Sequence, residues 1–480
     1  MGLDRYQNVI IGSGEGGKYL AWHLAQSGQS TVVLERRWIG GSCPNINCLP
    51  TKNEIRSAKV ADLVHHSGEF GVKTGPTSTE MAAVTNRKRE MVKAQVAAHL
   101  EKYKSTGAEL VMGEAKFAGP KMLEVRLNDG GARTVAGERV FLNLGTRATI
   151  PPVPGLRECG PLTHIEALEL DLLPEHMVVV GGGYVGLEFA QAYRRFGSKV
   201  TILQRGSHLL DRQDPDVSEE VQRILAAEGI DVVTSADIAS VEGRSGAEVR
   251  LALRTPKGER RIVASHVLAA SGRTPNTAGI GLETAGIELV AAGWIRVNDR
   301  LETTAPGVWA MGECAGSPQF THASLDDFRI IRDNLAGGNR STRGRLMPSC
   351  LFTDPQVAQV GLTETSAKGL GVAVQVAKVP MSSVLRTLTT GEKQGFMKAL
   401  IAPGDGRIIG FTMVGAEAGE VMAVVQMAMQ GGLPYTAIRD SVLAHPTMAE
   451  GLNGFFSAVK PAQASANASS VVDSQLSHQS

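Results

Sequence analysis

The sequence predicts an α/β protein that contains two parallel βαβ units followed by a C-terminal α+β module. Three observations support this fold class. A glycine-rich turn, GSGEGG, lies between an apolar strand-like run and a helical pattern near the N-terminus. The same order recurs around GGGYVG, and two such units indicate two nucleotide-binding halves. After residue 346 the repeat stops, and strand-like runs are followed by a long apolar helix.

The first unit is predicted as a strand at Asn8–Ile11, a helix at Lys18–Gln26 and a strand at Thr31–Leu34. Its turn has the G-x-G-x-x-G pattern, with glycines at Gly12, Gly14 and Gly17. Glycine is needed there because the backbone must approach a pyrophosphate at the helix N-terminus. Glu35 lies 18 residues after Gly17, where a carboxylate can accept ribose hydroxyls. We therefore expect dinucleotide binding rather than a merely tight structural turn.

The second unit is predicted as a strand at Met177–Val180, a helix at Leu187–Phe196 and a strand at Val200–Leu203. Its glycines are Gly181, Gly183 and Gly186. The position that corresponds to Glu35 is Gln204, followed by Arg205. An acid there would repel a 2′-phosphate, whereas Arg205 offers it a cation, so NADPH is expected over NADH. The alternative is that Arg205 is a solvated surface residue.

The remaining segments are less specific. A charged helical stretch at 80–103 is expected to pack outside the first unit, and domain boundaries are predicted at 150–155 and 341–347. Strands are predicted at 372–379, 396–401 and 407–414, and a helix at 418–429. The serine-rich residues 461–480 are expected to form a flexible tail.

Composition excludes several classes of protein. The 480 residues include 49 Lys and Arg against 48 Asp and Glu, and this balance argues against a nucleic-acid or membrane-surface partner. No apolar run is long enough for a membrane span, and the first residues lack the apolar core of a signal peptide. Five Cys are too few for a disulfide scaffold, so a cytoplasmic protein is expected.

Cys43 and Cys48 form a CxxxxC pair in the segment GGSCPNINCLPTK. A pair this close indicates metal binding, redox chemistry or accident, and a zinc site would need further ligands nearby in the sequence. Lys52 follows Cys48 by four residues, so on a helix its ammonium would lie on the same face and favour the thiolate. The isolated Cys159, Cys314 and Cys350 are expected to be ordinary buried thiols.

This segment resembles the redox-active disulfide motif of the class I pyridine nucleotide–disulfide oxidoreductases. Further matches, in the family's order, are LNLGTR, SGRTPNT, TTAPGVWAMGE, FTDPQVAQVGL and HPTMAE, so the resemblance covers about residues 5–460. GSPQFTHASLDDFRI and HPTMAEGLN resemble the mercuric-reductase-like branch most. The resemblance implies a glutathione-reductase-like fold: two Rossmann-like domains and a dimerisation domain. The implied limits are FAD domain 1–150, NAD(P) domain 151–275, return to the FAD domain 276–345 and dimer-interface domain 346–460.

The resemblance also implies roles for individual residues. Cys48 would lie beside the flavin, and Cys43 would be the outer thiol that exchanges with substrate. Lys52 would pair with Glu188, Tyr184 would cover the flavin until nicotinamide enters, and His445 would be the base that Glu450 orients. Glu313 replaces the family's Asp at the ribityl chain, and Asn47 stands where many relatives have Gly. The expected cofactor contacts are Gly12, Gly14, Gly17, Glu35, Gly41, Ser42, Lys52, Thr146, Gly181, Gly183, Tyr184, Gly186, Gln204, Arg205, Gly272, Arg273, Gly312 and Glu313, with no metal site.

The expected function is that of an NADPH-preferring, FAD-dependent disulfide oxidoreductase that acts as a homodimer on a small disulfide. The implied route runs from nicotinamide to flavin, then to Cys43–Cys48 and the substrate. No Cys follows Cys350, so the C-terminal Cys pair of true mercuric reductases is missing and mercury detoxification is disfavoured. Dihydrolipoamide dehydrogenase and glutathione reductase remain open. A flavoprotein that reduces oxygen, quinones or metal ions with the disulfide as a sensor, and an inactive FAD-bound scaffold, are further alternatives.

Overall fold

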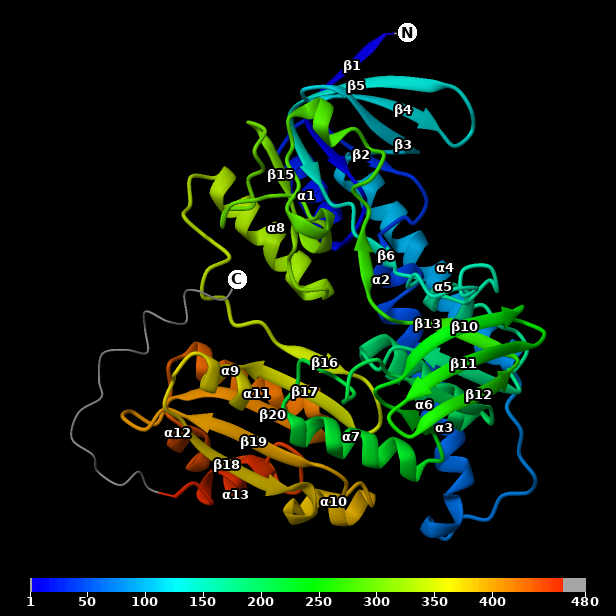
Figure 1. Cartoon of the computed structure of the whole chain (residues 1–480). Helices are drawn as coiled ribbons and strands as arrows, with labels where there is room; N and C mark the ends of the chain where they lie inside the picture. The colour runs from blue at the N-terminus through cyan, green and yellow to red at the C-terminus, as the bar shows by residue number, and fades with distance from the viewer. Residues whose placement is uncertain (1, 461–480) are drawn as a thin grey trace.

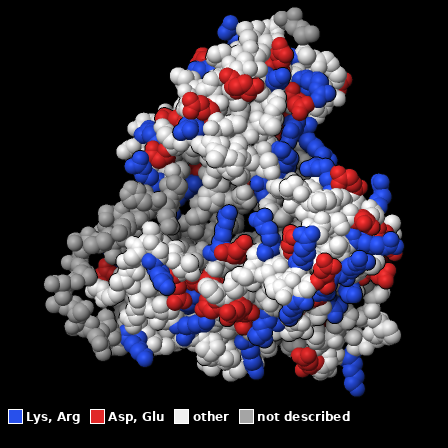
Figure 2. All heavy atoms as spheres, viewed as in Figure 1, with Lys and Arg blue, Asp and Glu red and all other residues white. Residues whose placement is uncertain are grey.

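The computed structural model describes residues 2–460, and Figure 1 shows their arrangement. The first βαβ unit lies at the top of the view, the second at the lower right and the C-terminal module at the lower left. The tail predicted at 461–480 lies outside the described residues. Within residues 2–460, no helix is both long and apolar enough to cross a membrane. Figure 2 shows Lys and Arg interspersed with Asp and Glu on one face, in keeping with the balanced composition.

The first predicted βαβ unit is confirmed as β1 (Leu3–Ile11), α1 (Glu15–Gln26) and β2 (Thr31–Glu35). Strand β1 pairs in parallel with β2 and with β5 (Ala132–Leu142), β2 with β3 (Glu109–Gly119), and β5 with β15 (Val308–Ala310). The antiparallel strand β4 (Met122–Leu127) joins β3 to β5. Helices cover this sheet, so β2 is buried along its whole length, as parallel strands require.

The helix predicted at 80–103 is α4 (Met81–Thr106), and it packs against α1 through an edge contact between the rings of Tyr103 and Trp22, 5.6 Å apart. Helix α8 (Thr321–Leu335) also lies beside α1, where Tyr19 stacks on Phe328. The chain therefore returns to the first unit after leaving it, which brings residues near 313–324 to the first glycine turn.

The second predicted unit is also confirmed, as β7 (His176–Val180), α6 (Tyr184–Phe196) and β8 (Lys199–Leu203). Its parallel sheet has the order β13-β7-β8-β9, with β9 at Asp231–Val233 and β13 at His266–Ala269. An antiparallel sheet of β10 (Asp237–Gly243), β11 (Val249–Thr255) and β12 (Gly258–Ala264) and the helix α7 (Pro215–Ala227) complete it. Short strands β6 (Thr146–Ala148) and β14 (Arg273–Pro275) pair where the chain passes between the two units.

The helix α3 (Cys48–His65) connects the two units. It follows the one-turn helix α2 (Ser42–Asn45), and its residue Ala58 belongs to the same apolar core as Phe189 and Tyr193 of α6. The first two turns of α3 carry Cys48 and Lys52, so the packing of this helix on α6 fixes where those side chains lie relative to the second unit.

The predicted α+β module is confirmed as an antiparallel sheet with the order β16-β17-β20-β19-β18. Its strands are β16 (Ser349–Leu351), β17 (Gln356–Gly361), β18 (Gln375–Pro380), β19 (Phe396–Ile401) and β20 (Ile408–Gly415). The predicted helix is α11 (Ala418–Gln430), and α9 (Glu364–Gly369), α10 (Leu385–Thr390), α12 (Tyr435–Arg439) and α13 (Gly451–Ser457) complete the module. The strand predicted at 372–379 begins three residues later, after the turn that follows α9. The four domain limits stay predictions.

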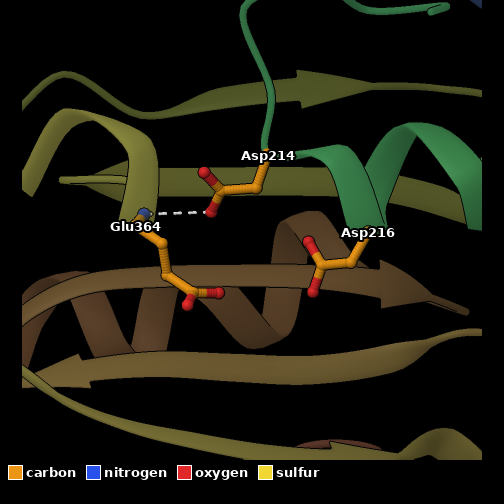
Figure 3. A group of neighbouring side chains, drawn as sticks. All are labelled: Asp214, Asp216 and Glu364. Carbon is orange, nitrogen blue, oxygen red and sulfur yellow. Dashed lines mark hydrogen bonds between the residues drawn. The ribbon is translucent and has the colours of Figure 1, made fainter. Parts of the chain in front are cut away.

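A buried ionic cluster joins the second unit to this module. Figure 3 shows the carboxylates of Asp214, Asp216 and Glu364 facing one another, a pattern that also suits a metal ion. The ammonium of Lys398 donates to all three, at 2.8, 2.8 and 2.7 Å, and therefore occupies the space between them. Burial alone would raise the pKa of Asp214, but hydrogen bonds from Lys398 and Thr365 outweigh it and lower that pKa to about 2.

Replacing Lys398 with Met should lower the free energy of unfolding by about 3–5 kcal/mol, because three carboxylates then lose their shared cation. Lys398 and Asp214 are 2% and 3% exposed, so water cannot replace the bond between them, whereas Asp216 and Glu364 are 29% and 43% exposed and can be hydrated. Lys378 is the matched control: it also pairs with Asp216, but it is 43% exposed, and Lys378→Met should cost under about 1 kcal/mol. Urea denaturation measures both, and equal losses would contradict the assigned role of burial.

Candidate active site

A cleft of ≈1400 Å³ runs along the first unit. Its wall includes the glycine turn at one end and both members of the CxxxxC pair at the other. The segments around residues 143–147 and 313–324 form much of the remaining lining. This single cavity therefore brings together residues that lie about 300 positions apart in the sequence.

The first glycine turn has the backbone geometry that the motif predicts. Gly12 has φ +96°, and a Cβ there would lie 2.3 Å from the carbonyl oxygen of Asn143. A Cβ at Gly17 would lie 2.4 Å from the carbonyl oxygen of Gly12, so this glycine allows the close approach of helix and strand. Gly14 is the N-cap of α1 and lines the cleft, so the positive end of this helix lies at the end of the cleft where a phosphate is favoured.

Glu35 ends β2 as predicted, but its carboxylate is already engaged by the protein. One oxygen accepts from the N–H and the hydroxyl of Ser13, and the other accepts from the N–H groups of Arg37 and Trp38. These four bonds use its four ordinary acceptor positions. Ribose hydroxyls would therefore share Glu35 with the loop that it holds in place.

The loop before the cysteines lies directly on the glycine turn. Gly41 has φ +80°, and a Cβ there would lie 2.5 Å from the Cα of Gly14. Gly41 is the N-cap of α2, and Ser42 and Cys43 line the cleft beside it. Glycine at both positions keeps this part of the cleft open, as close approach of a dinucleotide backbone requires.

Three of the predicted cofactor residues meet on the opposite wall. Thr146 donates to the carboxylate of Glu313, and the guanidinium of Arg273 lies 3.5 Å from that carboxylate and donates to Thr146 at 2.5 Å. Gly312 (φ +71°) and Gly272 (φ +128°) form the turns that carry Glu313 and Arg273. Glu313 lines the cleft, and its role at the ribityl chain stays a prediction.

The cysteine pair is the reactive feature of the cleft. Both are free thiols, and they line the cavity. The hydrogen bond from Cys43 lowers the pKa of Cys48, and Thr321, whose hydroxyl lies 3.1 Å from Cys48 Sγ, and Lys52 act in the same direction against burial. The same hydrogen bond raises the pKa of Cys43. Cys48 is therefore the thiolate of the pair.

Lys52 and Glu188 form the expected ion pair between α3 and α6, with Lys52 Nζ 2.9 and 2.8 Å from the two carboxylate oxygens. Glu188 is 5% exposed and also accepts from the N–H of Phe352, while the Lys52 ammonium lies over the Phe352 ring. The pair fixes the ammonium one helical turn from Cys48, where it stabilises negative charge on the sulfur.

The second glycine turn repeats the geometry of the first. Gly181 has φ +117°, and a Cβ at Gly186 would lie 2.1 Å from the carbonyl oxygen of Gly181. Gln204 Oε1 accepts from the N–H of Gly182 at 2.9 Å, just as Glu35 accepts from Ser13. Gly183 is the N-cap of α6, and Arg205 is exposed. Gln204 thus occupies the position of Glu35 without its charge.

His445 and Glu450 are brought together but lie outside the cleft lining. Both carboxylate oxygens of Glu450 lie 2.9 Å from His445 Nδ1, and the His445 side chain is 62% exposed. Tyr184, by contrast, is half-buried at the N-terminus of α6 and packs near Phe320 of the cleft wall. Within one described chain, His445 therefore does not complete the cysteine site.

Three polar residues that shape the cleft were missed. Asn143 accepts from the N–H of Gly17 and donates to the Met311 carbonyl, so it ties the glycine turn to the returning chain. Asp327 is fully buried and accepts from the Gly312 N–H at 2.7 Å, which positions Glu313. Thr321 contacts Cys48. The LNLGTR match includes Asn143, and GSPQFTHASLDDFRI includes Thr321 and Asp327, but neither motif indicates what these side chains contact.

One expectation about the isolated thiols was wrong. Cys159 and Cys314 are buried, but Cys350 is only half-buried because its strand β16 is the edge of the five-stranded sheet. Burial raises the pKa of Cys350 to about 12, so the thiol stays protonated and unreactive near neutral pH.

Comparisons with known proteins agree with this geometry. The family model described as pyridine nucleotide-disulphide oxidoreductase matches residues 6–327, and that of the family's dimerisation domain matches residues 347–454. The probable pyridine nucleotide-disulfide oxidoreductase RclA of Escherichia coli is 36% identical over 464 residues, covering 95% of this chain and all of that protein. A mercuric reductase of Streptomyces lividans is 34% identical, covering 93% of this chain and 94% of that protein.

Solved structures show the same similarity. The HOCl-induced flavoprotein disulfide reductase RclA of E. coli has a TM-score of 0.86 at 34% identity, covering 95% of this chain and all of that chain. A Cu(II) complex of that protein has a TM-score of 0.87 at the same identity and coverage. LpdA of Mycobacterium tuberculosis has a TM-score of 0.84 at 25% identity, covering 95% of this chain and 99% of that chain.

Proposed function

This chain belongs to the pyridine nucleotide-disulphide oxidoreductases and is an FAD-dependent oxidoreductase; we propose that its electron donor is NADPH and its acceptor a small disulfide. The observation that carries the proposal is the Cys43–Cys48 pair, which opens into the glycine-walled cleft with Cys48 as the thiolate. FAD, when bound in this cleft, would supply hydride acceptance and electron-pair release to sulfur, which side chains alone cannot do.

The side chains of this protein then carry out the individual steps of thiol–disulfide exchange. His445 takes the proton of the Cys43 thiol, whose sulfur attacks one sulfur of the substrate disulfide, forms a mixed disulfide and releases the first thiolate; the imidazolium then gives its proton to that thiolate. Cys48 then attacks Cys43, closes the Cys43–Cys48 disulfide and releases the second thiolate. Lys52 and Thr321 stabilise the charge on Cys48 between these steps. The substrate is thereby reduced by two electrons and the cysteine pair is oxidised by two.

We propose that the active form is a homodimer in the cytoplasm. The dimerisation-domain match and the exposed His445 support the dimer, because the imidazole needs a partner's cleft in which to act. A cysteine pair that cycles between thiol and disulfide forms suits a reducing compartment that supplies NADPH.

A second candidate acceptor is a soft metal ion. The RclA of E. coli has been solved as a Cu(II) complex, and several relatives are mercuric reductases. A thiol pair with one thiolate also binds such ions. Assays of NADPH and NADH oxidation with lipoamide, oxidised glutathione, cystine, Cu²⁺ and Hg²⁺ would separate the two candidates.

Anaerobic reductive titration tests whether the cysteines take part at all. The protein should consume about four electrons per FAD, two for the flavin and two for the disulfide. Consumption of two would exclude the cysteine pair from the circuit and favour the alternative flavoprotein that reduces oxygen, quinones or metal ions directly.

Replacing Arg205 with Gln should weaken NADPH binding by roughly ten-fold or more and leave NADH binding nearly unchanged, because only NADPH carries the 2′-phosphate. Calorimetric titration with NADP⁺ and NAD⁺ measures both. Arg250→Gln is the control, since Arg250 is also exposed in the second unit but lies on β11, away from the glycine turn. Equal losses for both coenzymes, or a native preference for NADH, would contradict the assignment.

A further inference from the structure

We propose that Gln213 and Ser349 act as a latch that holds Tyr184 in its closed position and thereby sets the affinity for the nicotinamide coenzyme. The inference rests on the proposed function, in which Tyr184 covers the place that the nicotinamide ring must enter. Gln213 and Ser349 are positioning residues, because they act on the coenzyme only through Tyr184.

A directed chain of hydrogen bonds runs through the Tyr184 hydroxyl. Gln213 Nε2 donates to Tyr184 Oη at 3.4 Å, and Tyr184 Oη donates to Ser349 Oγ at 3.2 Å. Ser349 Oγ in turn donates to the carbonyl oxygen of Gln359 at 3.5 Å. Each hydroxyl accepts once and donates once, so the Tyr184 hydroxyl has both of its roles satisfied only while the ring stays in this position.

The latch residues come from different parts of the fold. Gln213 lies in the loop before α7 of the second unit, and Ser349 begins β16 of the dimerisation domain. Tyr184 begins α6, beside the second glycine turn. A movement of the Tyr184 ring away from its present position near Phe320 would therefore have to break its bonds to both of these segments.

Burial increases the energetic cost of breaking these hydrogen bonds. Ser349 is 9% exposed, and burial raises the pKa of Tyr184, so its hydroxyl stays protonated and continues to donate. Gln213 Oε1 is buried and has no hydrogen-bond partner among the described residues. An unpaired buried acceptor destabilises the fold. The favourable interaction that the Gln213 side chain makes at this position is therefore the hydrogen bond that its N–H donates to Tyr184.

The consequence is a competition between the latch and the coenzyme. If nicotinamide binds only when Tyr184 has moved, the apparent dissociation constant is the intrinsic one divided by the open fraction. A weak hydrogen bond to a neutral group changes an equilibrium by about two- to ten-fold. The latch therefore lowers coenzyme affinity by a measurable factor.

Removal of the latch should tighten binding. We expect Tyr184→Phe, which keeps the ring but loses both bonds, to bind the coenzyme about three- to ten-fold more tightly than the native holoenzyme. Gln213→Leu and Ser349→Ala should each give part of this gain. In the Tyr184→Phe background, Gln213→Leu should add nothing, because its partner hydroxyl is already absent. Calorimetric titration of each holoenzyme with NADP⁺ and NAD⁺ measures these changes without turnover.

Two controls separate latch release from other effects. The fragments 2′,5′-ADP and AMP lack the nicotinamide ring, so their affinities should be the same in every variant. Ser105→Ala removes an exposed hydroxyl at the end of α4 and should change no affinity. Unchanged dinucleotide binding in all three latch variants, weaker binding in Gln213→Leu, or additive gains in the double variant would each overturn the latch. Failure of the native protein to bind either dinucleotide would instead refute the proposed function.

Discussion

Replacing Cys43 with Ser should abolish disulfide reduction, a loss on the order of 10⁴-fold or more, while the variant with its flavin oxidised keeps a long-wavelength thiolate-to-flavin absorption band. The two effects separate because Cys43 is the outer nucleophile, whereas Cys48 carries the negative charge. Its pKa is lowered by Cys43, Thr321 and Lys52. Stopped-flow absorbance gives the band, and turnover with a small disulfide gives the rate.

Cys48→Ser should lose both the band and disulfide turnover. A lowered pKa keeps the thiolate present at pH 7, where an ordinary thiol of pKa about 8.5 is mostly protonated, so the native band should persist at that pH and fade only in more acidic solution. Cys159→Ala is the matched control, since Cys159 is buried in the second unit away from the cleft. Full disulfide reductase activity in Cys43→Ser would refute the proposed route.

The sequence predicted the parts of the site that local spacing determines. Both glycine turns have positive φ at their first residue because the strand-turn-helix pattern requires it, and the i, i+4 spacing placed Lys52 on the same helix as Cys48. Gln204 was matched to Glu35 by counting from the glycines, and both side chains accept from the loop in the same way. Patterns of this kind depend on a few neighbouring residues.

Contacts between distant segments could not be predicted in this way. Asp327 and Asn143 support the cofactor loops through contacts that no local pattern predicts, because the motifs that contain them do not indicate which backbone groups they bind. From the sequence alone, Lys398 resembles an exposed lysine of a strand. In the structure it is buried and pairs with three carboxylates, two from the second unit and one from the C-terminal module. The partners of such residues are fixed only when the returning chain and the C-terminal sheet pack in place.

His445→Ala should slow thiol–disulfide exchange by about 10²–10⁴-fold, the usual effect of removing a positioned acid–base group. Glu450 fixes the imidazole through Nδ1, which leaves Nε2 as the nitrogen that can exchange a proton with substrate sulfur. Rapid mixing should show flavin reduction by NADPH nearly unchanged, because that half-reaction needs no proton from His445. His23→Ala, on the exposed side of α1, should leave both half-reactions at the native rate.

The exposed position of His445 makes a sharper test possible. If each site combines Cys43 of one subunit with the imidazole of the other, a dimer of one Cys43→Ser chain and one His445→Ala chain contains one intact site. Co-expression of the two inactive variants in equal amounts makes half of the dimers mixed, so about a quarter of the native activity should return. A site contained within a single chain would give no recovery, because every chain then lacks one of its two groups. Recovery near a quarter would therefore establish both the role of His445 and the need for two chains.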